Sequence, residues 1–412
     1  MRRYAERLKK LLWASLIISI ILHIILVTVF WVSGTSSVGT LPIFHDFSAY
    51  FQAGVKFINA ESLYASTAEF PRPSSLPERY HGMEYLYPPI VVIIFIPLSF
   101  LSFWTAGLVW TLLSLMCISS SILYLYKLKG ETLRLTSSLF LLLLIFGFYP
   151  VKQSIYMGQI TLILTAVLTL SVSRMYSTPE ALQDKALFAI FNVFPVFIKP
   201  YYAPILLPQI KDRQKMMFSG IFILILGLLS VFFFGPAENF EYLNVILEGR
   251  GRASSASIRW TGGPYEPLYV FGKFKYIPRL LFFTIVTIIG LITVNIESKK
   301  AERYLFVLGI STFLLLSPGA KYYTLVVMIP AILISFWEER ARNSVYTFVP
   351  IMTALLIHSH KVLFQYSPLV LRRIGFLNLL IESGPYIQPA VWGVLSLFVL
   401  SAYRLLEIRF DL

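Results

Sequence analysis

Long uncharged runs separated by short polar stretches dominate this chain. About twelve apolar segments are present, near residues 11–33, 88–103, 105–126, 136–150, 159–175, 186–208, 217–235, 277–296, 304–318, 321–337, 344–358 and 388–406. The longer ones reach the roughly 20 residues that a helix needs to cross a bilayer. The pattern predicts an all-α polytopic membrane protein with about twelve transmembrane helices, in a single integral membrane domain over residues 1–412.

Several segments are shorter than a full crossing, which predicts bent or partial helices. The clearest case is 186–208, because Pro195, Pro200 and Pro204 fall inside it. Proline removes a helical hydrogen bond and clashes with the preceding turn. We therefore expect a broken helix in this segment.

Composition excludes other classes. The chain is 57% hydrophobic and 14% charged, with a mean hydropathy of +0.72. Soluble domains carry about 25% charged residues, so soluble, disordered and disulfide-scaffold classes are excluded. The single Cys117 allows no intramolecular disulfide.

The net charge of +14 fits a membrane protein, because cytoplasmic loops accumulate Lys and Arg. No basic stretch stands beside a foldable soluble domain, so no nucleic-acid partner is expected. The N-terminal MRRYAERLKK precedes an apolar run too long for a signal-peptide core, which predicts an uncleaved first span and a cytoplasmic N-terminus. Ten later basic residues fall on that same side: Lys211, Arg213, Lys215, Lys299, Lys300, Arg303, Arg340, Arg342, Arg404 and Arg409.

Both termini should therefore be cytoplasmic, in the cell membrane. With twelve crossings, however, the basic segment 127–134 falls outside, against the charge rule. Three connections are too long to be turns, near 34–87, 236–276 and 359–387, and all three are expected on the extracytoplasmic face. Long loops on one face of a bundle are where binding and catalysis usually lie.

The first of these loops contains a candidate base. Apolar residues follow Asp46 at helical spacing, namely Phe47, Tyr50, Phe51, Val55 and Ile58, which predicts an amphipathic helix along the membrane surface. One reading makes Asp46 the N-cap of this helix. The other makes it a general base at the water–lipid boundary. The two readings are compatible, since a cap also fixes the direction of the carboxylate.

The distribution of carboxylates weighs against a transporter. The chain has four Asp residues, and Asp184, Asp212 and Asp411 lie in basic or flanking segments. No apolar segment contains an Asp or Glu, whereas ion-coupled transporters usually keep such a residue inside the membrane. A flippase of lipid-linked sugars and a non-catalytic scaffold stay as alternatives.

Basic residues on the expected outer side point to an anionic ligand. Lys199 lies within an apolar segment, where a lysine either snorkels to the interface or meets an anion. Arg250, Arg252 and Arg259 lie among serines in the second long loop, against the charge bias. Guanidinium groups suit phosphate oxygens, although contact with lipid headgroups explains them equally. His358 and His360 are two residues apart and do not share a helix face, so no metal site is expected.

Short motifs in order along the chain resemble the polyprenyl-phosphate-sugar-dependent glycosyltransferases of the C-type membrane fold, and most closely glycosyltransferase family 87, the polyprenol-phosphate-mannose-dependent mannosyltransferases. The matching pieces are Asp46-Phe47 with Tyr50, the stretch 54–64, Tyr85 to Pro89, Gly158-Gln159, Ile198-Lys199-Pro200 and Ser317-Pro318. The chain departs from the family where members often carry histidines after the Ser-Pro, since Lys321, Tyr322 and Tyr323 follow here. It also has Ser255-Ala256-Ser257 where an Asn-Gln-Ser element is frequent.

The resemblance implies sugar transfer on the outer face, from a polyprenyl or dolichyl phosphate sugar to a lipid or glycan acceptor, with membrane lipids as surroundings. Asp46 would match the catalytic aspartate of the family. Eight residues from the matching motifs and loops are expected to bind substrate: His45, Tyr50, Glu61, Tyr64, Tyr87, Gln159, Lys321 and Tyr322. Lys199 and the three loop arginines are expected to bind the donor phosphate.

The chemistry agrees with these residue types. Displacing a lipid phosphate from a sugar needs a base for the acceptor hydroxyl and cations for the leaving phosphate. A phosphomonoester carries less charge than a nucleotide diphosphate, so protein cations can replace Mg²⁺. We expect an inverting single displacement without metal or other cofactor.

Overall fold

The computed structural model describes residues 44–64, 84–129, 148–176, 181–248, 276–293, 296, 298–316, 322–342, 344–365 and 389–410. Every regular element in these ranges is a helix. They are α2 (His45–Ile58), η2 (Pro89–Ile94), α3 (Ile96–Ser99), α4 (Phe103–Leu128), α6 (Tyr149–Met157), α7 (Thr161–Met175), α8 (Leu182–Ile198), η4 (Pro200–Lys211), α9 (Arg213–Glu248), α11 (Tyr276–Thr293), α12 (Lys299–Leu316), η6 (Tyr322–Val327), α13 (Met328–Ala341), η7 (Val345–Thr347), α14 (Phe348–Gln365) and α17 (Pro389–Phe410). The all-α prediction is confirmed for this part of the chain.

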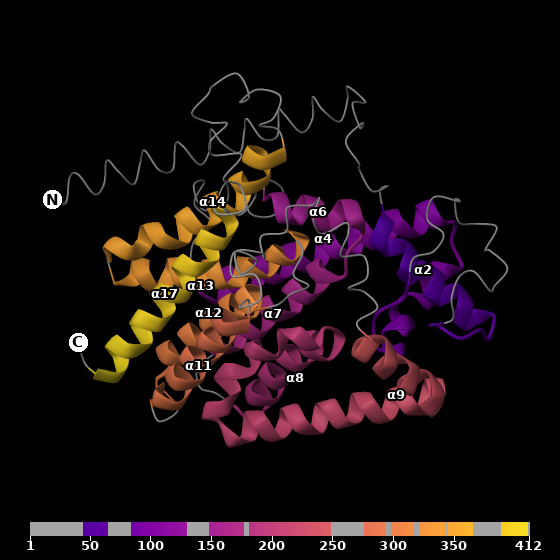
Figure 1. The fold of residues 1–412 in the computed structure, drawn as a ribbon, viewed down its shortest axis with the longest axis horizontal. Coiled ribbons are helices and arrows are strands. Elements are labelled where there is room, and N and C mark those ends of the chain that lie inside the picture. The colour runs from indigo at the N-terminus through magenta and orange to yellow at the C-terminus, as the bar shows by residue number, and fades with distance from the viewer. Residues whose placement is uncertain are drawn as a thin grey trace.

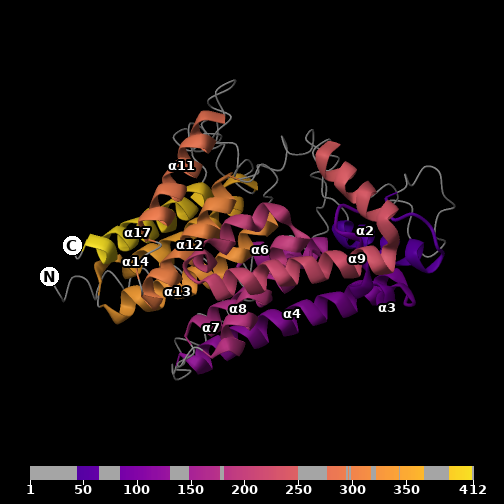
Figure 2. The same cartoon turned by 90° about the horizontal axis from the view of Figure 1, so that it is seen from below.

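Two of these helices are long and apolar enough to cross a bilayer, Phe103–Leu128 and Arg213–Leu247. α4 and the first part of α9 run along the length of the molecule, with α2 near one end and the C-terminal end of α17 towards the other (Figures 1 and 2). Many apolar side chains on these two helices are exposed, among them Leu108, Leu112 and Phe232. An outer surface of this kind is what lipid contact requires.

The segment 186–208 is broken as its prolines predict, and it also reverses direction. α8 ends at Ile198, and the 3₁₀ helix η4 runs back from Pro200. At the far end of this pair, Lys185 Nζ lies 2.8 Å from Asp212 Oδ2. The two arms match in length, at about 25 Å for α8 and about 24 Å for η4. Lys199 therefore stands at the tip of a helical hairpin, which we call the α8–η4 hairpin.

α9 changes direction at Gly235, whose φ of 76° lies outside the helical region. Pro236 follows and cannot continue the helical hydrogen bonds of the preceding turn. The side chain of Asn239 accepts from Ser230 Oγ at 2.7 Å and donates to the Gly235 carbonyl at 2.7 Å, so the bend has its own polar support. In Figure 2 the part after the bend turns away from the long axis and passes beside α2.

The end of the bundle opposite α2 is held by buried ion pairs, which we call the clamp. Its hub is Glu338 and Glu339 at the end of α13, which are 4% and 0% exposed. Glu338 accepts from Tyr176 Oη at 3.2 Å and lies 3.1 Å from Arg303 Nε. It thereby ties α13 to the end of α7 and the start of α12.

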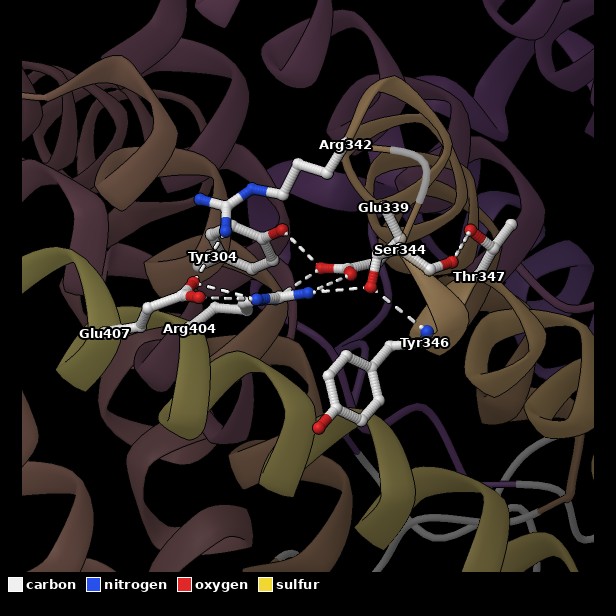
Figure 3. A network of polar contacts seen from close by, with 8 residues as sticks. All are labelled: Tyr304, Glu339, Arg342, Ser344, Tyr346, Thr347, Arg404 and Glu407. Carbon is white, nitrogen blue, oxygen red and sulfur yellow. Dashed lines mark hydrogen bonds and ion pairs between the residues drawn. The ribbon is translucent and has the colours of Figure 1, made fainter. Parts of the chain in front are cut away.

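Glu339 ties α13 to α17 and, a second time, to α12. Arg404 of α17 donates its Nε to Glu339 at 2.8 Å, and Tyr304 Oη donates at 2.7 Å. Arg404 and Arg342 both pair with Glu407 (Figure 3). Burying charges costs several kcal/mol each, and partners from several helices offset that cost only if those helices stay in place.

The clamp corrects the expected placement of residues 127–129, the described start of the basic segment 127–134. Lys129 Nζ, just after α4, lies 3.9 Å from Glu338 Oε1 and 4.4 Å from the ring centre of Tyr176. The described start of the basic segment, residues 127–129, thus lies at the same end of the bundle as Arg303 and Arg340, and its predicted separation from them was wrong. That prediction counted the segment 88–103 as a crossing. It forms only η2 and the four-residue helix α3, which pack against α2.

Replacing Arg404 by Met tests the clamp. The variant leaves Glu339 buried without its guanidinium partner, so we expect a loss of about 3 kcal/mol of unfolding free energy. Thermal unfolding of the detergent-solubilised protein measures this loss. Arg409→Met is the matched control, because Arg409 lies on the same helix and is exposed. The double variant Glu339→Leu with Arg404→Met should recover most of the loss. Equal melting temperatures for the Arg404 and Arg409 variants would contradict the role of the clamp.

Candidate active site

Asp46 lies at the start of α2 but does not cap the helix. The N-cap residue is Phe44, which has a φ of 64° and makes no side-chain capping bond. Its backbone N–H donates instead to the Tyr156 carbonyl at 2.7 Å, so α6 fixes the point where α2 begins. The N-cap reading of Asp46 was therefore wrong. The residue stands in the first helical turn and its carboxylate points elsewhere.

The Asp46 carboxylate is nearly buried, at 9% exposure of the residue, and is contacted on both oxygens. Gln159 Nε2 donates to Oδ2, and His45 Nδ1 lies 3.1 Å from Oδ1. Gln159, which is 2% exposed, comes from the turn between α6 and α7. A buried carboxylate needs such partners, because an unpaired one would shed its charge. Three residues that the sequence singled out thus meet at one point.

α2 is helical as predicted, and other elements of the protein pack around most of it. The apolar positions Phe47, Tyr50 and Phe51 are buried at 0–1% exposure. Polar positions between them, such as Ser48 and Gln52, are buried as well. η2, α3, α4 and α6 all contact this helix. The periodicity identified the helix correctly, whereas only its last turn, with Ile58 at 43% exposure, is open.

Tyrosine hydroxyls extend the site away from Asp46. Tyr50 Oη lies 2.8 Å from Tyr87 Oη and 3.4 Å from Gln159 Oε1. Tyr64 Oη donates to the Tyr87 carbonyl at 2.5 Å, which ties the 59–64 loop to the segment before η2. Burial raises the pKa of Tyr87 well above its usual value, and nearby Tyr50 and Asp46 add to the effect. The Tyr87 hydroxyl therefore stays protonated at neutral pH.

Lys199 reaches the same cluster from the tip of the α8–η4 hairpin. It is 4% exposed, so it does not snorkel to the interface. Its Nζ donates to Thr161 Oγ1 at 3.1 Å and lies 5.7 Å from the ring centre of Tyr87. A cation and a carboxylate thus both lie near Tyr87.

Gly158 holds this arrangement together in a way that the sequence only hinted at. Its φ of 67° is left-handed, and a Cβ atom there would stand 2.4 Å from Phe47 Cβ. Trp110 Nε1 of α4 donates to the Gly158 carbonyl at 2.9 Å. Sequence reasoning missed Trp110 and Thr161, because each lies in an apolar run without a distinguishing neighbour.

Two more of the predicted residues, Glu61 and Tyr322, lie on described segments other than those above. Glu61 follows the C-terminal end of α2, where its backbone N–H donates to the Lys56 carbonyl at 2.9 Å. Tyr322 begins η6. Four predicted residues lie outside the described residues, namely Arg250, Arg252, Arg259 and Lys321. Within the described ranges, no group of three or more His, Cys, Asp or Glu is placed to hold a metal ion.

The arrangement can move a proton and bind an anion. A carboxylate held by an amide can accept a proton from a substrate hydroxyl. A buried lysine beside a hydroxyl and an aromatic ring can bind the charge that develops on a leaving group. These two abilities together fit a transfer reaction at a group that carries phosphate.

Gly158→Ala tests the left-handed turn. We expect a loss of about 2 kcal/mol or more, because the backbone is strained and the new methyl meets Phe47. The thermal midpoint should fall by several degrees. In the control Gly227→Ala, a methyl within α9 meets nothing within 4 Å, and helix propensity should raise stability slightly. A neutral Gly158→Ala would show that the turn tolerates a side chain.

Comparison with known proteins bears on the same residues. The sequence model of glycosyltransferase family 87 matches residues 85–318, which is 234 of the 412 residues. The match begins at Tyr85, spans Tyr87, Gln159 and Lys199, and ends at Pro318; Asp46 precedes it. No curated protein and no solved structure matches the chain. Because the match covers more than half of the sequence, the chain belongs to glycosyltransferase family 87.

Proposed function

We propose that this membrane glycosyltransferase moves a sugar, with mannose the first choice, from a polyprenyl or dolichyl phosphate donor to a hydroxyl of a lipid or glycan acceptor. The observation that supports it best is the buried Asp46 carboxylate, which Gln159 contacts on one oxygen and His45 on the other. Lys199, 4% exposed, lies near the ring of Tyr87, whose hydroxyl contacts that of Tyr50. A base and a cation at one site are the two groups that displacement of a lipid phosphate requires.

In the proposed reaction, Asp46 takes the proton of the acceptor hydroxyl as the acceptor oxygen bonds to the anomeric carbon. The bond from that carbon to the phosphate oxygen breaks, and both of its electrons leave with the lipid phosphate. Lys199 holds the developing charge, and Arg250, Arg252 and Arg259 are proposed to share it. Attack opposite the leaving group inverts the anomeric centre. The leaving phosphomonoester carries few charges, so protein cations suffice and the proposed reaction uses no metal.

We propose that Asp46 faces the extracytoplasmic side and the clamp faces the cytoplasm. Two changes to the expected crossings support this orientation. In the proposed topology residues 88–103, which form only short turns, do not cross, and the α8–η4 hairpin crosses twice in place of once. The number stays at about twelve, but the basic residue Lys129 then falls at the clamp end beside Arg303. Lys129 then lies on the cytoplasmic side, as the positive-inside rule requires, whereas the topology expected from the sequence had placed it outside.

Asp46→Asn tests the base. The protein in liposomes receives labelled polyprenyl-phosphate-mannose and a lipid-and-glycan extract of the source cells as acceptor. We expect at least a thousandfold loss of labelled product for Asp46→Asn, because the amide cannot accept the proton. Glu84→Gln is the control, since Glu84 is an exposed carboxylate at the same end. Equal product from Asp46→Asn and wild type would remove Asp46 from the mechanism and direct attention to Glu61, Glu84 and Glu266.

Cysteine accessibility tests the orientation. In a Cys117→Ser background, Lys127→Cys places a thiol at the exposed end of α4, and Glu84→Cys places one near Asp46. In intact cells a membrane-impermeant thiol reagent should label Glu84→Cys and spare Lys127→Cys until the membrane is opened. Labelling of Lys127→Cys in intact cells would overturn the proposed orientation.

A further inference from the structure

Gln159 contacts Asp46 with the nitrogen of its side-chain amide. Nε2 faces Asp46 Oδ2, and Oε1 faces Tyr50 Oη at 3.4 Å. The reverse orientation would set the amide oxygen against the carboxylate, where neither atom has a proton to donate. The carboxylate of Asp46 and the hydroxyl of Tyr50 therefore determine the orientation of the Gln159 amide.

The tyrosines supply the donor that this orientation needs. Tyr50 has one hydroxyl proton, and its oxygen lies within reach of Gln159 Oε1 and of Tyr87 Oη at 2.8 Å. When Tyr87 donates to Tyr50, the single hydroxyl proton of Tyr50 can be donated to Gln159, and Gln159 donates to Asp46. In this order both tyrosine hydroxyl protons and one amide proton meet an acceptor, an arrangement that we call the Tyr87–Asp46 relay. Burial keeps the Tyr87 hydroxyl protonated, as its raised pKa shows.

The same short turn also holds the cation. Thr161, two residues after Gln159, accepts from Lys199 Nζ at 3.1 Å. Trp110 holds this turn by donating to the carbonyl of the left-handed Gly158. Gln159 and Thr161 therefore fix the carboxylate and the lysine relative to each other through one stretch of backbone.

We infer that Gln159 is a positioning residue, which orients the Asp46 carboxylate through the relay, in place of the substrate contact that the sequence predicted. The inference deepens the proposed function and rests on it for its catalytic meaning. In the relay Tyr50 contacts Gln159, and Tyr87 contacts Tyr50, so both tyrosines act on Asp46 only through Gln159. Loss of a substrate contact would raise KM, whereas loss of a positioning residue lowers kcat and alters the proton affinity of the base.

The groups around Asp46 bear on any pH measurement. His45 is adjacent on α2, Tyr50 lies one turn on, and Tyr87 lies before η2. η2 and α3 contain no titratable residue, and those of α4 begin at Cys117, beyond Trp110. α6 carries Tyr149, Lys152 and Tyr156, and the α8–η4 hairpin carries Lys199. All of them are unchanged in the variants below, except Tyr50 where stated.

The test measures the protonation of Asp46 directly by infrared difference spectroscopy of the purified protein during pH titration. The Asp46 signal is the carboxyl band that Asp46→Asn removes. In Gln159→Leu we expect its pKa to rise by about one unit, because the ionised form loses a donor. Gln159→Glu, which keeps the size of the side chain, should raise it further, because two carboxylates then share the site. Tyr50→Phe should produce a smaller rise.

Gln209→Leu is the matched control, since Gln209 is equally buried at 2% exposure and contacts Ser219. Its Asp46 band should titrate as in wild type. An unchanged Asp46 pKa in both Gln159 variants would overturn the inference. So would a change of equal size in Gln209→Leu, because it would show a general effect of altered packing.

Turnover measurements separate this inference from the proposed function. With labelled donor, Gln159→Leu should lose tenfold or more in kcat while KM for the donor stays within about twofold. The acidic limb of the kcat/KM profile should move to higher pH with the Asp46 pKa. A rise in donor KM at unchanged kcat would overturn the positioning role. If wild type transfers no sugar from any donor offered, the infrared result still decides the relay, and only the proposed function falls.

Discussion

A charged side chain inside an apolar helical bundle has to be surrounded by partners, and this constraint shapes both ends of the protein. At the clamp, Glu338 and Glu339 are paired with arginines and tyrosines from α7, α12 and α17. At the other end, the described contacts of Asp46 are an amide and an imidazole. Ion pairs with guanidinium groups hold a carboxylate as a structural element. An amide supports the charge of a carboxylate but leaves it able to take up a proton.

The two ends are connected by elements that run between them. α7 starts beside Asp46 with Gln159 and Thr161, and Tyr176 just beyond its end contacts Glu338. The α8–η4 hairpin starts at the clamp end and brings Lys199 to the site. Packed interiors resist deformation. Fixing the helices at one end of the bundle therefore limits how far they can shift at the other end. The clamp thus supports the spacing of the carboxylate and the lysine without touching either.

The sequence predicted the kind of fold, and it singled out several residues that the fold brings together at the candidate site. Helical periodicity after Asp46 located α2, and the prolines located the break before Lys199. The errors have a common cause, because a pattern of residues does not say what packs against it. The spacing of apolar residues predicted an amphipathic α2, whereas the polar Ser48 and Gln52 between them are buried as well. The apolar run 88–103 read as a crossing, but Pro88, Pro89 and Pro97 limit it to short turns.

The roles of the polar residues were harder to predict than their location. Gln159 was expected to contact substrate, yet its amide is turned to Asp46. A Gly-Gln pair looks the same in the sequence whether the glutamine contacts substrate or Asp46. Only the fold brings residue 46 close to residue 159. Trp110 shows the same limit, because its hydrogen bond to Gly158 crosses 48 residues and leaves no trace in the local sequence. The site is therefore built from contacts between segments, with the left-handed turn at Gly158 as the point where α2, α4, α6 and α7 meet.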